Sequence, residues 1–321
     1  MAILVAADFD ADAWAAWWPA LQAALPGERL VRAQNGATVG DTEGGGCAAS
    51  DIDIALVANP PQGTLRGLSR LLLIQSLWAG VDALLADPSV PTQVPLARMV
   101  DPAMNEAMAE TALWAVLALQ RGFFAYREQQ HRCEWRALPQ RRADETTVAV
   151  LGLGQMGRTV AARLALQGYR LLGWSTREVR IEGLVAHCGA AGLAQVLASA
   201  QVVVNLLPLT PVTRDLFNAA AFARMPRGAS LVNLARGAHV VEADLLDALD
   251  RGHIQHAVLD VFRTEPLPPG HRLWSHPRVT LLPHAAAQTD PRSAARVVAR
   301  NVRALRAGQP IEHLVERGRG Y

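Results

Sequence analysis

The fold is decided by the stretch VAVLGLGQMG, Val148–Gly157, near the middle of the chain. Four apolar residues of strand length lead into a G-x-G-x-x-G turn, and residues 159–166 behind it have helical character. In such a unit Gly152 permits the tight turn, Gly154 lets the backbone approach a pyrophosphate, and Gly157 lets helix and strand pack closely. Unpaired N–H groups at the helix start favour an anion. The stretch predicts a dinucleotide-binding unit, with an ordinary tight turn as the alternative.

The second strand of this unit, expected at Arg170–Trp174, ends without an acidic residue. Sites for NAD usually place Asp or Glu there, and such a carboxylate would repel a 2′-phosphate. Here Ser175, Thr176 and Arg177 follow, which can all donate hydrogen bonds, and the guanidinium supplies a charge-assisted one. The pattern predicts NADP as the cofactor and leaves NAD possible. The alternative is that Arg177 is only a solvated loop charge.

Alternating strand and helix patterns continue on both sides of this unit. Downstream, four further apolar runs have strand length: Val202–Leu206, Ser230–Leu234, Ala257–Asp260 and Val279–Leu282. Upstream, a second series has its own strand candidates: Ile3–Ala7, Ile52–Ala58, Leu71–Leu77 and, more weakly, Pro95–Met99. Alternation of this kind predicts parallel sheets covered by helices, and two series predict two lobes with a cleft between them.

Two helical patterns are expected to connect the lobes. The apolar pattern from Met104 to Tyr126 is too long for a simple surface helix and predicts a bridge between them, and the residues behind it, 127–145, are polar and irregular. Pro291–Ala307 predicts a last helix that packs back onto the first lobe. The predicted fold class is therefore α/β with two lobes.

Three polar side chains follow strands of the downstream series. Arg236 comes after the strand in LVNLARG, Glu265 after the strand in LDVFRTEP, and His284 after the strand in LLPH. In an open α/β sheet, ligands bind outside the carboxyl ends of the strands, so all three are expected to point toward one site. Taken singly, each has a plain structural explanation, such as a solvated loop acid or a structural histidine.

Together these three groups have the composition that reduction of a ketone needs. Arg236 can bind a substrate carboxylate bidentately and polarise the keto oxygen. His284 can deliver a proton to that oxygen as a hydride arrives. Glu265, hydrogen-bonded to the other ring nitrogen, would orient the imidazole and favour its protonated form.

The order of these motifs, a glycine turn followed by LVNLARG, LDVFRTEPLP and LLPHAAA, resembles the D-isomer-specific 2-hydroxyacid dehydrogenase family. Within it, the chain looks most like the glyoxylate/hydroxypyruvate reductase A branch, over nearly its whole length. The resemblance implies a Rossmann-type cofactor domain, residues 104–287, inserted in a flavodoxin-like substrate domain, residues 1–103 plus 288–321. It implies reduction of a small 2-keto acid such as glyoxylate or hydroxypyruvate, here with NADP(H), and Arg236, Glu265 and His284 as the catalytic residues.

The resemblance also implies the other contacts. Asp260 matches the aspartate that binds the nicotinamide carboxamide, and LWAGVD, Leu77–Asp82, matches a carboxylate-binding loop whose N–H groups form an anion nest. The chain departs from the branch at two places. Trp78 stands where the branch usually has a small residue, and Ala58-Asn59 stand before two prolines where the branch has a Trp-His pair. The size of the substrate therefore stays open. The cofactor contacts expected are Gly152, Gly154, Gln155, Met156, Gly157, Ser175, Thr176, Arg177, Leu207, Pro208 and Asp260. The substrate contacts expected are Trp78, Ala79, Gly80, Arg236 and His284.

The composition excludes several other classes of protein. The formal net charge is +2 without a concentrated basic run, so nucleic acid is not expected as a partner. The chain contains Arg but no Lys, which excludes a Schiff-base lysine and a Walker-type loop. Cys47, Cys133 and Cys188 show neither metal-ligand spacing nor a disulfide framework, so no metal is expected. With no signal peptide and no span of membrane length, the protein is expected to be soluble and cytoplasmic.

A homodimer is expected, as the family resemblance also implies. The long helix after Met104 and the extended segment Gln129–Ala143 suggest it, and Trp135, isolated in this polar stretch, could anchor the contact. Alternatively, Trp135 covers its own lobe. Two other functions stay open, because fold alone does not separate them. One is an NAD(H)-dependent dehydrogenase of a larger 2-keto acid or of an inorganic anion such as phosphite. The other is a dinucleotide-sensing, corepressor-like binding protein.

Overall fold

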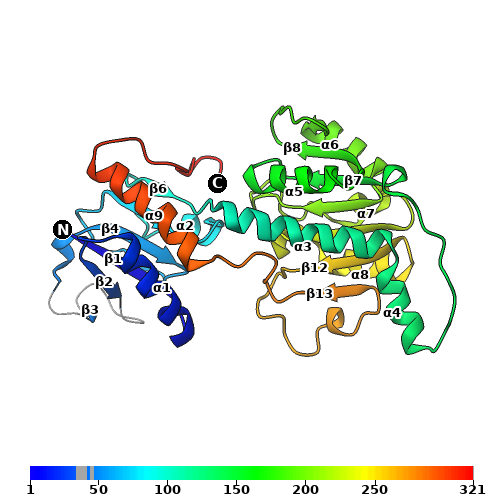
Figure 1. Ribbon diagram of the computed structural model, residues 1–321, viewed down its shortest axis with the longest axis horizontal. Coiled ribbons are helices and arrows are strands. Elements are labelled where there is room, and N and C mark those ends of the chain that lie inside the picture. The colour runs from blue at the N-terminus through cyan, green and yellow to red at the C-terminus, as the bar shows by residue number, and fades with distance from the viewer. Residues whose placement is uncertain (34–41, 44–46, 321) are drawn as a thin grey trace. The chain divides into compact units, whose positions relative to one another are not determined.

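The computed structural model describes residues 1–33, 42–43 and 47–320, which form two compact units (Figure 1). Unit 1 comprises Met1–Met104 and Thr289–Tyr321 within the described ranges, and unit 2 comprises Asn105–Gln288. Unit 2 is therefore one continuous segment inserted into the sequence of unit 1. Both units combine parallel strands with helices, which confirms the predicted α/β class.

Unit 1 is built on a six-stranded sheet in the order β3-β2-β1-β4-β5-β6. The antiparallel strand β3 lies at one edge, and the other five strands are parallel in the flavodoxin-like order. β1 (Ala2–Ala7) and β4 (Ile52–Ala58) are buried along their whole length, and their sequences are apolar without alternation except at the buried Asp53. The remaining strands are β2 (Leu30–Ala33), β3 (Thr42–Glu43), β5 (Leu73–Ser76) and β6 (Leu96–Ala97).

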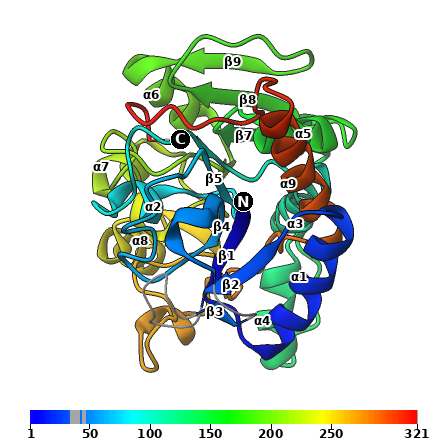
Figure 2. The ribbon, with the colours of Figure 1, turned by 90° about the vertical axis from the view of Figure 1, so that its left-hand side faces the viewer.

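Two helices from opposite ends of the sequence cover one face of this sheet. α1 (Ala11–Ala24) and α9 (Pro291–Arg306) lie side by side (Figure 2) and share one apolar core with strands β1, β4 and β5. In the last turn of α9, the guanidinium of Arg306 pairs with Glu28 at 2.9 Å and with Asp53. α2 (Asp82–Ala86) contributes to the core on the other face.

Unit 2 is built on a seven-stranded parallel sheet in the order β13-β12-β11-β10-β7-β8-β9. The chain starts in the middle at β7 (Thr147–Leu151), adds β8 and β9 on one side, and then adds β10 to β13 on the other, which is the Rossmann order. The other strands are β8 (Arg170–Ser175), β9 (Val185–Cys188), β10 (Val202–Asn205), β11 (Ala229–Asn233), β12 (Ile254–Leu259) and β13 (Val279–Leu281).

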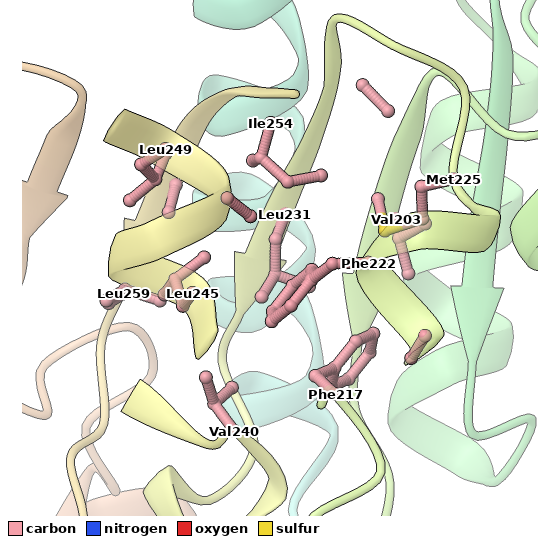
Figure 3. Close-up of a cluster of buried hydrophobic side chains, with 14 of the residues drawn as sticks. Val203, Phe217, Phe222, Met225, Leu231, Val240, Leu245, Leu249, Ile254 and Leu259 are labelled. Carbon is pink, nitrogen blue, oxygen red and sulfur yellow. The ribbon is translucent and has the colours of Figure 1, made fainter. Parts of the chain in front are cut away.

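Helices cover both faces of the sheet in unit 2. On one face, Phe217 and Phe222 pack with residues of β10, β11 and β12 in a core under three helices (Figure 3). Those helices are α6 (Gly189–Ser199), α7 (Ala219–Arg224) and α8 (Glu242–Asp250). On the other face, α3 (Pro102–Gln120) and α5 (Gln155–Ala165) cover Val150, Val204 and Val232. Among the described residues, no helix has both the length and the apolar character that crossing a membrane needs.

The long helix predicted over Met104–Tyr126 is wrong in its extent, because two helices occupy this region. α3 is followed by α4 (Phe123–His131), and Gly122 between them has a φ of +71°, a left-handed conformation that ends α3. Behind α4, residues 132–142 contain neither helix nor strand. The N–H of Leu138 donates to the Tyr126 hydroxyl at 3.0 Å, which fixes this segment, whereas the side chain of Trp135 is fully exposed.

Candidate active site

The turn from β7 into α5 has no room for side chains at two of its glycines. Gly152 has a φ of +99°, and a Cβ there would lie 2.6 Å from the carbonyl oxygen of Leu206. A Cβ on Gly157 would lie 1.8 Å from the carbonyl oxygen of Gly152. A Cβ on Gly154, by contrast, would meet nothing within 4 Å, so the backbone at the start of α5 borders open space. This arrangement fits an anion that binds the first N–H groups of the helix.

The end of β8 carries the residues predicted to select the cofactor. Trp174 is buried, and its indole N–H donates to the carbonyl oxygen of Gly189 at 2.8 Å, which fixes the strand end. Beyond it the Ser175 hydroxyl donates to the carbonyl oxygen of Arg177, while Thr176 and Arg177 are exposed. Hydroxyl and guanidinium groups therefore stand where a carboxylate would exclude a 2′-phosphate.

Arg236 follows β11 and precedes a short turn of 3₁₀ helix, Gly237–His239. Its carbonyl oxygen accepts a hydrogen bond from Asn233 Nδ2 at 3.0 Å, and its own Nη1 donates to the carbonyl oxygen of Ala235 at 2.8 Å. Gly237 lies directly against the next loop, because a Cβ on it would be 1.9 Å from the carbonyl carbon of Phe262. The loops that carry Arg236 and Glu265 are therefore in backbone contact.

Glu265 and His284, on the loops after β12 and β13, are hydrogen-bonded to each other. Nδ1 of His284 donates to Oε2 of Glu265 at 2.7 Å, and Oε1 of Glu265 accepts from the N–H of Phe262 at 2.8 Å. The carboxylate is thus held from two sides. Because Nδ1 of His284 is committed to Glu265, Nε2 is the ring nitrogen that faces away from this hydrogen bond. The His284 side chain is 53% exposed, so a substrate can reach it.

Asp260 holds the turn on which His284 stands. Its side chain is buried, and Oδ1 accepts from the N–H groups of Ala285 at 2.7 Å and Ala286 at 3.1 Å. Burial raises the pKa of the Asp260 carboxyl above its ordinary value, although the two N–H donors act in the opposite direction. These bonds support His284 at a φ of +55°, which is uncommon for residues other than glycine. Sequence reasoning did not predict this role for Asp260; its predicted contact with the carboxamide stays a prediction.

In unit 1, the loop predicted to bind a carboxylate follows β5. The N–H of Trp78 donates to Oγ of Ser76 at 3.0 Å, and the Ser76 hydroxyl donates to the carbonyl oxygen of Trp78 at 2.9 Å. The indole of Trp78 packs against Phe9 and Trp17, with ring centroids 5.9 and 5.8 Å apart. Residues 79–80 are partly exposed. The bulky side chain is therefore held within an aromatic cluster of its own unit.

The structure brings most of the predicted residues of unit 2 to one edge of its sheet, where the strands end. It adds three buried polar side chains that sequence reasoning missed, Asn205, Asn233 and His239. The signal for two of them was present, since each asparagine interrupts an otherwise apolar strand run. The signal for His239 was absent, because its partners are distant in sequence. No group of three or more metal-ligating side chains occurs among the residues that the structure describes.

Comparison with known proteins identifies relatives over the whole chain. Residues 113–286 match the family model described as D-isomer specific 2-hydroxyacid dehydrogenase, NAD binding domain. A glyoxylate/hydroxypyruvate reductase A of Serratia proteamaculans (strain 568) is 43% identical over 274 residues, which covers 84% of this chain and 88% of the relative. A D-isomer specific 2-hydroxyacid dehydrogenase from Xanthobacter autotrophicus Py2, solved in complex with NADPH and MES, superposes with a TM-score of 0.94 at 40% identity, covering 100% and 99% of the two chains.

A second solved structure has a more specific description. It is an NADPH-dependent glyoxylate/hydroxypyruvate reductase from Sinorhizobium meliloti in complex with NADP and sulfate. Its TM-score is 0.90 at 35% identity, with 99% of each chain covered. The similarity therefore extends over both units and includes proteins crystallised with NADP(H).

Proposed function

Because this chain belongs to the D-isomer-specific 2-hydroxyacid dehydrogenase family, we propose that it reduces a small 2-keto acid, such as glyoxylate or hydroxypyruvate, to the 2-hydroxy acid with NADPH. The observation that carries the proposal is the His284–Glu265 hydrogen bond, formed on the loop next to the one that holds Arg236. The names of the reductases from Serratia proteamaculans and Sinorhizobium meliloti support the substrate class.

Unit 2 has the features that an NADP cofactor requires. Open space borders the backbone at Gly154, where the N–H groups of Gln155 and Met156 would receive the pyrophosphate. Ser175, Thr176 and Arg177 would hold the 2′-phosphate. The remaining contacts that we propose, toward the nicotinamide end, are Leu207, Pro208 and Asp260. When bound, the cofactor supplies the hydride.

The side chains of this protein perform the rest of the reaction. Arg236 binds the substrate carboxylate and polarises the keto oxygen, and Nε2 of His284 gives a proton to that oxygen. Glu265 keeps the ring oriented through Nδ1 and stabilises its charged form. In unit 1, the backbone of Ala79 and Gly80 and the flank of Trp78 provide further substrate contacts.

Steady-state rates with a panel of 2-keto acids test this proposal. With NADPH, we expect kcat/KM to be highest for glyoxylate and hydroxypyruvate and lower for branched or aromatic 2-keto acids, and NADH to be the poorer cofactor. Highest rates with NADH and a larger 2-keto acid would instead favour the alternative dehydrogenase. NADPH binding without turnover of any 2-keto acid would favour a dinucleotide-sensing protein, which the fold also permits.

We further propose that the protein works as a homodimer in the cytoplasm. Trp135, fully exposed on residues 132–142, supports the dimer, because aromatic side chains are enriched at interface cores. Cys47, Cys133 and Cys188 are all free thiols, which supports a reducing compartment.

A further inference from the structure

A buried polar network joins the loop after β10 to the loop after β11. It consists of the side chains of Asn205, Asn233 and His239, each of which is 0% exposed. Burying such groups is unfavourable unless they are hydrogen-bonded. Here Nδ2 of Asn205 donates to Oδ1 of Asn233 at 2.9 Å, and it is also 2.9 Å from Nδ1 of His239. These three side chains, where β10 and β11 end, therefore satisfy one another's hydrogen-bonding groups.

The network determines where the His239 ring carries its proton. Oδ1 of Asn205 accepts from the N–H of Leu207 at 3.3 Å, so the amide nitrogen is the atom that faces the ring. An amide nitrogen can only donate, so Nδ1 of His239 is the acceptor and the ring is neutral with its proton on Nε2. This Nε2 donates to the carbonyl oxygen of Pro208 at 3.3 Å.

The other end of the network is the backbone of Arg236. Oδ1 of Asn233 accepts the hydrogen bond from Nδ2 of Asn205, and Nδ2 of Asn233 donates to the carbonyl oxygen of Arg236 at 3.0 Å. The backbone N–H of His239 donates to the same carbonyl oxygen at 3.2 Å. The backbone of Arg236 is thus fixed both by the asparagine pair and by the residue that contacts Pro208.

We propose that His239 is a positioning residue that aligns the two ligand-binding loops of unit 2 with each other. Through Nε2 it fixes the carbonyl of Pro208 on the loop assigned to the cofactor. Through Nδ1, Asn205 and Asn233 it fixes the backbone that presents Arg236 to the keto acid. The proposal rests on the proposed function, since that function assigns Pro208 to the cofactor and Arg236 to the substrate. His239 itself touches neither ligand.

Two conservative substitutions separate the two halves of this role. In His239→Asn, the side-chain amide reaches the position of Nδ1, so the acceptor for Asn205 is retained and the donor to Pro208 is lost. In His239→Gln, the amide reaches the position of Nε2, so the donor is retained and the acceptor is lost. His239→Leu removes both. The matched control is His253→Gln, because His253 also bonds to backbone carbonyls, those of Phe222 at 2.8 Å and Met225 at 3.0 Å, but stands just before β12 at the opposite edge of the sheet.

The contact of His239 with Pro208 is the Pro208 half of the role, and the Kd for NADPH, measured by fluorescence titration without keto acid, reports it. The connection of His239 through Asn205 and Asn233 to the Arg236 backbone is the Arg236 half, and the KM for the keto acid at saturating NADPH reports it. We expect His239→Asn to raise the Kd about ten-fold with KM within about two-fold, and His239→Gln to do the reverse, since a buried bond lost is worth roughly that factor. His239→Leu should raise both, and His253→Gln neither.

Equal changes of Kd and KM in His239→Asn and His239→Gln would overturn the proposal, as would changes confined to the unfolding temperature, because a merely structural histidine predicts either result.

The outcome is separable from failure of the proposed function. If the wild-type protein turns over no 2-keto acid, the NADPH titration still tests the Pro208 half. In that case hydrogen exchange at the amides of residues 235–237 replaces KM: faster exchange in His239→Gln than in His239→Asn supports the Arg236 half, and equal exchange contradicts it.

Discussion

Oε2 of Glu265 accepts a hydrogen bond from Nδ1 of His284 over 2.7 Å, while Oε1 is held by the N–H of Phe262. The negative charge of Glu265 therefore has a fixed place beside the imidazole, and the loop of Glu265 sets that place. A carboxylate in this position both selects the ring orientation and stabilises the ring when it is protonated.

Glu265→Gln should separate these two effects. The amide can still orient His284, but it carries no charge to stabilise the ring while the ring holds the proton. We expect kcat for keto-acid reduction to fall by about ten-fold or more, with the Kd for NADPH unchanged, because a charge-assisted hydrogen bond is lost. Glu182→Gln, at an exposed acid of unit 2, is the control and should leave kcat unchanged. An unchanged kcat in Glu265→Gln would refute the pairing.

His284→Ala should lower turnover by about a hundred- to ten-thousand-fold, which is the range for loss of a general acid. NADPH binding should persist, because the turn around Gly154 and α5 does not involve His284. The measurement is single-turnover reduction together with an NADPH titration of the same preparation. Near-normal turnover in this variant would overturn the mechanism.

Arg177→Ala should discriminate between the two nicotinamide cofactors. Loss of a charge-assisted bond to the 2′-phosphate costs roughly 1.5–3 kcal/mol, so the KM for NADPH should rise about ten- to a hundred-fold while that for NADH changes little. Arg180→Ala supplies the control, because Arg180 is also exposed on the segment after β8. If both variants affect both cofactors alike, Arg177 is only a solvated charge.

His256 should make the folded protein sensitive to acid. Burial of its ring, together with nearby Arg127, His276 and Arg278, lowers its pKa to about 4 from the ordinary value of 6.5. Between these two pH values the unfolded chain binds more protons than the folded protein. The free energy of unfolding therefore decreases as the pH falls from 6.5 toward 4, by at most about 3 kcal/mol. Below that window both states are protonated and no further loss arises from this group.

Urea unfolding at pH 7, 5.5 and 4.5 measures this effect. His256→Asn should unfold with a midpoint that depends less on pH than that of the wild-type protein. Nε2 of His256 lies 2.9 Å from the hydroxyl of Thr280, so the variant is also expected to be less stable at pH 7. An unaltered pH dependence would show that other groups cause the acid sensitivity.

Trp135→Ala should weaken self-association. Sedimentation at micromolar concentration should show a dimer for the wild-type protein and a larger monomer fraction for the variant, because truncation of a buried interface tryptophan commonly raises the dissociation constant more than ten-fold. Trp274→Ala, which removes another exposed indole, should leave the dimer intact. A wild-type monomer under these conditions rejects the assembly.

The parts of the fold that the sequence predicts well are those where local pattern and burial agree. β4 coincides with the predicted run Ile52–Ala58, and β7 contains the four apolar residues predicted before the glycine turn, because both strands are buried among apolar neighbours. β9 was not predicted, since it is a partly exposed edge strand of only four residues, Val185–Cys188, with a mixed pattern. The break at Gly122 was missed because the apolar pattern continues across it, although the backbone there is left-handed.

The candidate site follows the same division. The positions of Arg236, Glu265 and His284 could be predicted because each directly follows a recognisable strand. The hydrogen bonds that fix them could not, since they join segments distant in sequence: Asp260 to the turn at Ala285, and Asn205 to His239. Hydrogen bonds between such distant segments depend on the register of neighbouring strands, and no local sequence motif predicts that register.

The insertion of unit 2 into unit 1 has a consequence for the newborn chain. The first sheet emerges from the ribosome without α9, whose Val297, Val298 and Val302 fill its core. All of Asn105–Gln288 must be synthesised before that helix exists, which takes roughly 10–40 s at typical elongation rates. Throughout this delay one apolar face of β1 and β4 lacks one of the two helices that cover it, so the whole of unit 2 is synthesised before the core of unit 1 can be completed.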